Sequence, residues 1–384
     1  MLSFRNLARR LHLWLGLSLG ILLTLLGLTG AALVFYVEID AALHPLPDAG
    51  LAAEPPGWQS PVWDTVLVTA RREFPDHAGD WQFEADVNTG AIPARFYPSA
   101  TLHDHHAERE MVWFSADGTR VVRSETWGQY LMSWLYELHM HLLAGETGSL
   151  LVGWGGLATL MILFTGLVSW WPRGSWRSAL AFKRNAVSIR RLRDLHKLAA
   201  LWSAPLLMLL VLTGVLLALP TVKDQVLSAL QLSPESTSTP RSIATGKVAI
   251  TLGQALDIAH AMVPASRLVF IEVPGDPQAA LRLRVQQPGD LHGRFPQSSV
   301  YVDRYSGEVL AVKDVERGNA YTLVTNWIRP LHDGSIAGIG TRILAVVLGL
   351  LPAALLITGI LYWRERIARR RHHHLPSTFA DHRT

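Results

Sequence analysis

Hydrophobic positions concentrate in four long runs, separated by stretches in which polar and apolar residues mix. None of these runs carries Lys, Arg, Asp or Glu in its central part. A helix needs about 20 apolar residues to cross a bilayer, so each run predicts a membrane-spanning helix in contact with lipid. The predicted fold class is a membrane all-α four-helix bundle. The four runs are residues 11–37, 150–171, 198–219 and 343–363.

Shorter periodicities in the two long connections predict one small α+β module in each. The segment 251–263 has the apolar spacing of an amphipathic helix, and alternating apolar residues follow it. A polar, Ser- and Pro-rich linker precedes this helix. The second connection is predicted to hold strands at 267–273, 280–286, 299–302 and 308–312. The first repeats the pattern, with a helix at 62–74 and strands at 81–87, 91–96, 111–115 and 120–124.

The distribution of positive charge predicts the orientation in the membrane. The N-terminal stub, the 172–197 segment and the 364–384 tail are short, rich in Lys and Arg and nearly free of acid. Cytoplasmic loops of membrane proteins carry such an excess. We therefore expect both termini inside (N-in/C-in) and both modules outside. The net charge of +4 reflects this topology and does not indicate nucleic-acid binding.

Four histidines recur at matched intervals and indicate a tandem duplication. A Thr-Gly pair begins 17 residues after His12 and again 17 residues after His196. Another begins 26 residues after His139 and 26 residues after His332. With the predicted topology, the first two histidines lie at the cytoplasmic end of the bundle and the other two at the external end. The Thr-Gly pairs fit close helix packing or room for a flat macrocycle.

Paired histidines in an apolar bundle predict haem. Two neutral imidazoles on one haem iron make a low-spin site for electron transfer, and bundles build such sites from facing helices. Because the chain has no cysteine, thiolate-ligated and covalently attached haem are excluded. We predict two non-covalent b-type haems, one between His12 and His196 and one between His139 and His332. His141 is the alternative outer ligand, and solvated or backbone-bonded histidines are the simpler explanation.

A further histidine cluster lies in the first external module. The spacing of His103, His105 and His106 could hold a metal ion. No convincing fourth ligand follows in the sequence. A solvated loop is therefore the favoured interpretation.

Several motifs together resemble the PepSY-associated transmembrane family. They are LHLWLGLSLG, LHKLAALW, LYELHMHLLAGETG and LHDGSIAGIG around the predicted helices, and YVDRYSGEVL at the end of the second module. Members are inner-membrane proteins of Gram-negative bacteria, and some are di-haem reductases of ferric siderophores. The resemblance implies PepSY-like modules in the periplasm. It also implies an inner-membrane, haem-dependent reductase acting on a hydroxamate ferric siderophore of the ferrioxamine type.

The predicted boundaries follow from the repeat and the charge pattern. The chain divides into helix 1–37, module 38–138, helix 139–171, basic loop 172–197, helix 198–219, linker and module 220–331, helix 332–363 and basic tail 364–384.

Residues beside the outer histidines are candidates for a substrate cleft. They are Trp127 and Trp134 near His139, and Arg329 and Asp333 next to His332. The sequence has no dinucleotide-binding or P-loop motif, so the expected electron donor is quinol or a cytoplasmic reductase. Two alternatives remain: a PepSY binding or regulatory membrane module without redox activity, and a haem subunit of another oxidoreductase. A transporter is less favoured, because the helices lack central charged residues.

Overall fold

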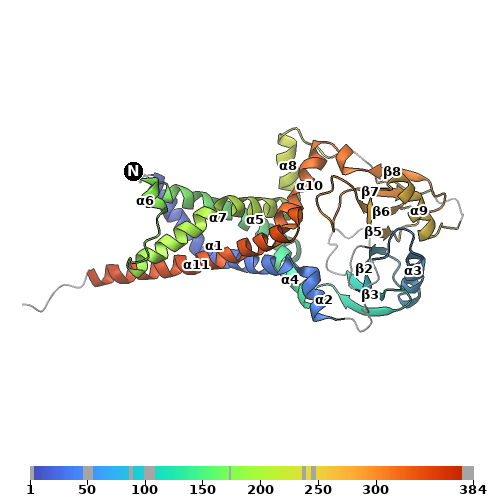
Figure 1. Cartoon of the computed structure of the whole chain (residues 1–384), viewed down its shortest axis with the longest axis horizontal. Coiled ribbons are helices and arrows are strands. Elements are labelled where there is room, and N and C mark those ends of the chain that lie inside the picture. The colour runs from blue at the N-terminus through green and yellow to red at the C-terminus, as the bar shows by residue number, and fades with distance from the viewer. Residues whose placement is uncertain are drawn as a thin grey trace, which may run out of the picture.

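The computed structural model describes residues 4–45, 55–85, 90–98, 109–172, 174–235, 239–243 and 248–373. A bundle of long helices forms one end of the molecule and a β-sheet domain forms the other (Figure 1). The start of the chain and the last turns of its final helix lie at the end of the bundle away from the sheet (Figure 1). Both modules therefore lie at the same end of the bundle. Two membrane crossings separate the first long connection from the second, so both connections emerge on the same side.

Four helices are long and apolar enough to cross a membrane, which confirms the four predicted spans. The first packs against the second and the fourth, and the third packs against the same two. Their apolar residues face outward over most of each helix, as lipid contact requires. These helices are α1 (Phe4–Leu33), α5 (Gly145–Trp170), α7 (Ser188–Ala218) and α11 (Ile339–His373).

The helices predicted to begin at residues 139 and 332 each consist of two helices in the structure. α4 (Leu131–His141) ends before α5, and α10 (Ala320–Asp333) ends before α11. Leu142 has φ 47° and Gly334 has φ 77°, so the backbone leaves the helical conformation at each point. The outer histidines therefore lie on short helices at the mouth of the bundle. The remaining short helices are α2 (Tyr36–Leu43), α6 (Trp176–Leu180) and α8 (Pro220–Ala229), with 3-10 turns η1 (Val315–Arg317) and η2 (Ser335–Ala337).

All eight predicted strands occur, but they form one antiparallel sheet in the order β4-β3-β2-β1-β5-β6-β7-β8. The two modules join where β1 pairs with β5, with Trp81 opposite Val273 and Glu84 opposite Phe270. Joining satisfies backbone groups that two separate sheets would leave at their edges. The strands are β1 (Asp80–Glu84), β2 (Ala91–Tyr97), β3 (Glu110–Ser115), β4 (Val121–Thr126), β5 (Arg267–Val273), β6 (Leu281–Gln286), β7 (Ser299–Val302) and β8 (Val309–Lys313).

Side chains alternate between the two faces of this sheet. Helices α3 (Val62–Glu73) and α9 (Leu252–Met262) cover one face and bury the main apolar core, which includes Trp81 and Phe83. Gln82 and Glu84 therefore point to the opposite face, toward the helical bundle. This second face carries a polar and aromatic layer between the sheet and the membrane helices.

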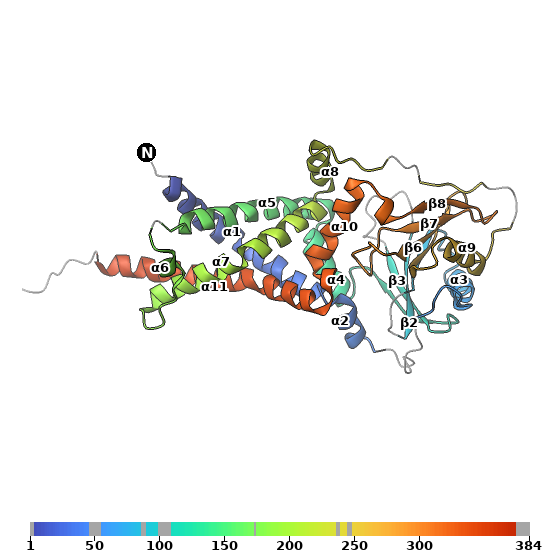
Figure 2. The same ribbon diagram turned by 45° about the horizontal axis from the view of Figure 1, so that its top comes forward.

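The same order of elements occurs twice along the chain (Figure 2). Each half has a long helix, two short helices, four strands, another short helix and a second long helix. Short helix α6 lies in the connection between the halves. The two halves therefore place matched elements on either side of the bundle and of the sheet.

Candidate functional site

The four repeated histidines form two pairs. His12 of α1 and His196 of α7 have ring centroids 6.2 Å apart, with an interplanar angle of 78°. His139 of α4 and His332 of α10 have ring centroids 6.4 Å apart, with an angle of 42°. One iron bound by a nitrogen of each ring at about 2 Å would place the two centroids about 6 Å apart. Both spacings therefore suit a shared metal.

The first pair lies at the end of the bundle away from the sheet, and the second at the sheet end. His12 is near the start of α1, whereas α4 and α10 lie where the bundle meets the sheet domain (Figure 1). We refer to them as the inner and the outer pair. The structure thus brings together the histidines that occupy matched positions in the two halves.

Three of the four rings bond through Nδ1 to a backbone carbonyl of a neighbouring membrane helix. A carbonyl oxygen only accepts hydrogen bonds, so Nδ1 carries the proton and the lone pair lies on Nε2. Metal-binding histidines are usually held in this way, because the bond fixes both the tautomer and the ring orientation. The bonds join His12 to Ile162, His196 to Leu355 and His332 to Leu210, each at 3.0 Å.

The fourth ring reaches the same arrangement through a hydroxyl group. The Nδ1 atom of His139 lies 3.0 Å from Oγ1 of Thr29. That hydroxyl donates to the carbonyl of Leu25 at 2.8 Å, so it accepts from the ring. His139 therefore also presents Nε2 as its unprotonated nitrogen.

The glycine of each Thr-Gly pair lies against one of these rings, and at three of the four positions a side chain would crowd the ring. A Cβ atom added at Gly214 would lie 2.8 Å from Cε1 of His332, and one at Gly30 would lie 2.9 Å from Cε1 of His139. At Gly166 the distance to His12 would be 3.0 Å. The neighbouring threonine bonds to its own helix, as Thr29 does. Each Thr-Gly pair thus forms the surface against which one histidine ring packs. The sequence pattern does not show this role.

Alanine substitutions at these glycines should have graded effects. Gly214→Ala places a methyl group inside the contact distance of His332 and should lower the thermal stability of the protein, because overpacking costs about 1–3 kcal/mol. Gly359→Ala is the matched control, since its Cβ would lie 3.5 Å from His196, an ordinary contact. Thermal unfolding of each variant, compared with the parent, measures both effects. Equal losses in the two variants would contradict this role of the glycine.

His141, the alternative outer ligand, makes a hydrogen bond with a carboxylate of its own helix. Its Nδ1 atom lies 2.7 Å from Oε2 of Glu137, whose other oxygen accepts from the indole N–H of Trp127. The indole of Trp127 is 8% exposed, with the guanidinium of Arg109 at 3.4 Å from its ring centroid. Trp127 therefore lies inside the protein rather than along an open surface.

The other candidate cleft residues lie around α4 and α10. Trp134 is 42% exposed. The guanidinium of Arg329 lies 4.7 Å from the ring centroid of Phe295. Asp333 accepts a hydrogen bond of 2.8 Å from Nε2 of His292. Asp333 thus takes part in a contact within the protein. The cluster of His103, His105 and His106 lies outside the described residues.

The donor set of the two pairs fits haem iron. Among the residues that the structure describes, no group of three or more His, Cys, Asp or Glu is arranged to hold a metal ion. A haem supplies the ring nitrogens around its iron, so the protein needs to provide only axial ligands. Two neutral imidazoles at this spacing would meet that need.

A buried ion-pair cluster stabilises the layer between sheet and bundle. Glu84 is 3% exposed and accepts from Arg294 at 2.6 Å and from Arg95 at 3.1 Å. Burial by itself raises the pKa of Glu84, but the charges of Arg294 and Arg95 outweigh it and hold the pKa below the ordinary value of 4.5. The carboxylate is therefore ionised in the folded protein.

Replacing Glu84 with glutamine should destabilise the sheet domain by about 3–5 kcal/mol, because two buried arginines lose their counter-charge. The folded pKa lies below 4.5, so this stabilisation is complete above that pH and is lost as the pH falls through the lowered value. Urea unfolding followed by circular dichroism measures the difference. A gap between variant and parent that stays the same in acid would contradict this origin.

A family model described as the PepSY-associated TM region matches residues 9–366. No curated protein matches the sequence. The matched region includes both histidine pairs, the whole sheet and most of each membrane-spanning helix. The chain therefore belongs to the PepSY-associated transmembrane family.

Proposed function

We propose that this membrane protein is a haem-dependent reductase that passes electrons across the membrane to Fe(III) in a siderophore. The observation that carries the proposal is the geometry of the two histidine pairs. Ring centroids 6.2 and 6.4 Å apart, with Nδ1 of each ring bonded to a neighbouring helix, suit two axial-ligand sites. Solvated or purely structural histidines have no need of this spacing at both ends of a bundle.

Each part of the site has a defined task in this proposal. His12 and His196 would hold the inner haem, and His139 and His332 the outer one. A haem bound by two imidazoles supplies one-electron transfer. Three helix carbonyls, and the Thr29 hydroxyl in the case of His139, keep the proton on Nδ1 of each ring, so that Nε2 stays available to iron. The glycines let the rings approach the helices, and the apolar side chains of the bundle exclude water.

The proposed direction follows the charge pattern. The basic N-terminal stub, loop and tail would lie in the cytoplasm, which places the inner pair there and the sheet domain in the periplasm of a Gram-negative bacterium. Quinol or a cytoplasmic reductase would supply the electrons. The repeated order of elements supports an origin by tandem duplication, with PepSY-like modules forming the sheet.

A hydroxamate ferric siderophore is the proposed substrate. Hydroxamate oxygens are hard donors that bind Fe(III) more tightly than Fe(II), so reduction by one electron releases the iron. The acceptor would dock at the sheet end of the molecule, next to the outer pair.

Reconstituted protein tests this function. Proteoliposomes that carry the whole chain, a quinol and a ferric hydroxamate siderophore should produce Fe(II), trapped by a coloured chelator. Liposomes without protein are the control. A haem-loaded protein that any reductant reduces, but that never passes electrons to the siderophore, would exclude this acceptor and favour a haem subunit of another oxidoreductase.

A further inference from the structure

The connection between β6 and β7, residues 287–298, forms a strap between the sheet and α10. The strap is closed on itself by Asp290, which is 7% exposed. Its carboxylate accepts from the backbone N–H groups of Gln287 at 3.0 Å, Gln297 at 2.7 Å and Ser298 at 3.3 Å. Because these bonds fix both ends of the connection, its middle is held as a rigid unit.

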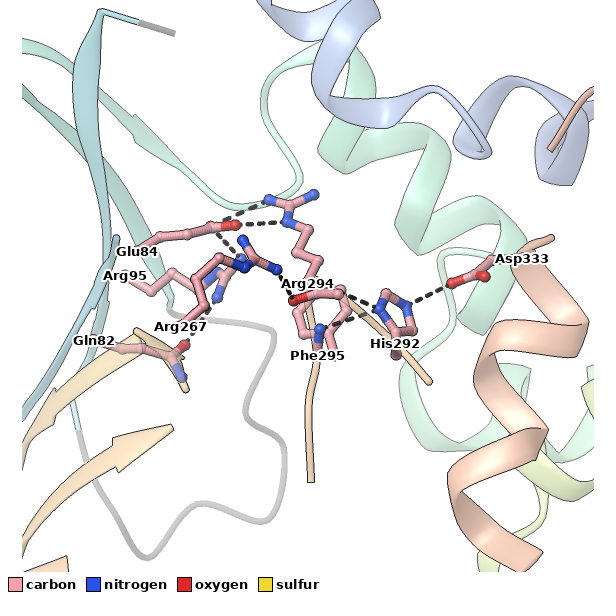
Figure 3. A network of polar contacts seen from close by, with 9 residues as sticks. Gln82, Glu84, Arg95, Arg267, His292, Arg294, Phe295 and Asp333 are labelled. Atoms are coloured by element: carbon pink, nitrogen blue, oxygen red, sulfur yellow. Dashed lines mark hydrogen bonds and ion pairs between the residues drawn. The ribbon is translucent and has the colours of Figure 1, made fainter. Parts of the chain in front are cut away.

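One side of the strap is bonded to the sheet. Arg294 reaches the buried Glu84 of β1 with two donors, at 2.6 and 3.2 Å (Figure 3). Arg267 of β5 donates to the backbone oxygen of Gly293 at 3.1 Å. The anchor therefore involves both central strands, where the two halves of the chain meet.

The other side of the strap is bonded to α10, and His292 makes the closest link. Its Nδ1 atom accepts from the backbone N–H groups of Arg294 and Phe295, each at 3.1 Å. The proton is therefore on Nε2, which donates to Asp333 at 2.8 Å (Figure 3). His292 is 6% exposed, so water competes little for this bond.

A second pair of hydrogen bonds supports the same contact about two helical turns away. The side-chain amide of Asn326, also in α10, donates to the backbone oxygen of Gly289 at 2.8 Å. Its oxygen accepts from the backbone N–H of Leu291 at 3.4 Å. The strap thus holds α10 at two points along its length.

This contact belongs to one half of the molecule. Asp333 directly follows the outer ligand candidate His332, whereas Met140 follows His139 at the matched position of the other half. The thioether of a methionine is only a weak acceptor and does not replace the carboxylate of Asp333. The sheet is therefore linked to the outer pair through α10. The hydrogen bond that makes this link has no counterpart at the matched position of α4.

We infer that the strap positions the imidazole of His332 against that of His139, with His292 as the positioning residue on the α10 side and Arg294 as the one on the sheet side. Rigid support of a ligand's own helix is what a metal site requires for fixed geometry. The inference rests on the proposed function only where haem is the readout, since the position of α10 can be measured without it.

Two substitutions separate the two roles of His292, which accepts hydrogen bonds within the strap and donates one to Asp333. In His292→Asn, the side-chain oxygen lies near the place of Nδ1, so the strap keeps its acceptor but loses the donor to Asp333. In His292→Gln, the amide reaches the place of Nε2 and keeps that donor. Asp64→Ala is the control: it removes two backbone bonds, to Leu252 at 2.7 Å and Gly253 at 3.1 Å, in the same domain but away from α10.

The absence of cysteine allows spin labels at chosen positions of the full chain. Labels at Leu323 of α10 and Val68 of α3, 46% and 62% exposed, report the position of α10 relative to the sheet. The second readout is the low-spin haem signal in electron paramagnetic resonance, in which the outer and inner sites are compared within each variant.

His292→Asn should broaden the label distance distribution and shift the outer haem signal while the inner signal stays unchanged. His292→Gln and Asp64→Ala should match the parent in both readouts. An unchanged distribution in His292→Asn would overturn the inference, as would equal broadening in Asp64→Ala. If the unsubstituted protein contained no haem, the proposed function would be contradicted instead. The label distances would still decide the role of the strap.

Discussion

Alanine in place of His332 should remove about half of the haem from the purified protein, because one of the two sites loses an axial ligand. The same loss is expected for His139→Ala, since the two ring centroids lie 6.4 Å apart and the two rings would hold the same haem. The haem that remains should keep the spectrum of the inner site. A pyridine haemochrome count per chain, together with the low-spin resonance signals, measures the effect.

His141→Ala is the control for this experiment. Its ring lies two residues from His139 and bonds to Glu137, so the variant should keep both haems. Loss of the outer haem in His141→Ala, with full haem in His139→Ala, would reverse the assignment of the outer ligand.

Alanine in place of His12 or His196 should leave the outer haem bound but stop electron delivery from the cytoplasmic side. The two rings form the inner pair, with ring centroids 6.2 Å apart. Iron reduction driven by a donor on that side should therefore fall to the rate of liposomes without protein. Inside-out membrane vesicles with a coloured Fe(II) chelator measure this rate.

Dithionite provides the internal reference for the inner-pair variants. It should still reduce the outer haem of His12→Ala directly, which shows that the protein is folded and loaded. Parent-like rates from a cytoplasmic donor in these variants would contradict a transmembrane route through both pairs.

Local patterns in the sequence were sufficient to predict most elements of the fold. The four membrane helices follow from apolar runs, and the strands from alternation of side chains, because both depend on neighbouring residues. The joining of the modules through β1 and β5 could not be predicted in this way. That pairing links residues nearly 190 positions apart, such as Glu84 and Phe270, and nothing near either strand indicates its partner.

The same distinction applies to the site. The repeat intervals were enough to choose four histidines, and the structure places them as two pairs. The sequence shows the Thr-Gly pairs but not their role, because that role depends on which helix packs beside each histidine. His12 contacts Gly166, whereas His139 contacts Gly30. Each Thr-Gly pair therefore lies on a helix other than the one that carries its histidine.

Sequence patterns also do not predict the contacts of the strap. His292 and Asp333 are 41 residues apart, and the residues around either one do not indicate the other. Asp333 was singled out because of its place next to His332, as a candidate cleft residue. Its bond to His292 instead makes it part of the support of α10.

An absorption spectrum of the detergent-purified full-length protein, oxidised in air and then reduced with dithionite, tests the central claim most directly. The account predicts sharp bands of b-type haem and a haemochrome count of about two haems per chain. A colourless protein after expression with ample haem would contradict it, and would leave a binding or regulatory membrane module as the better reading of the fold.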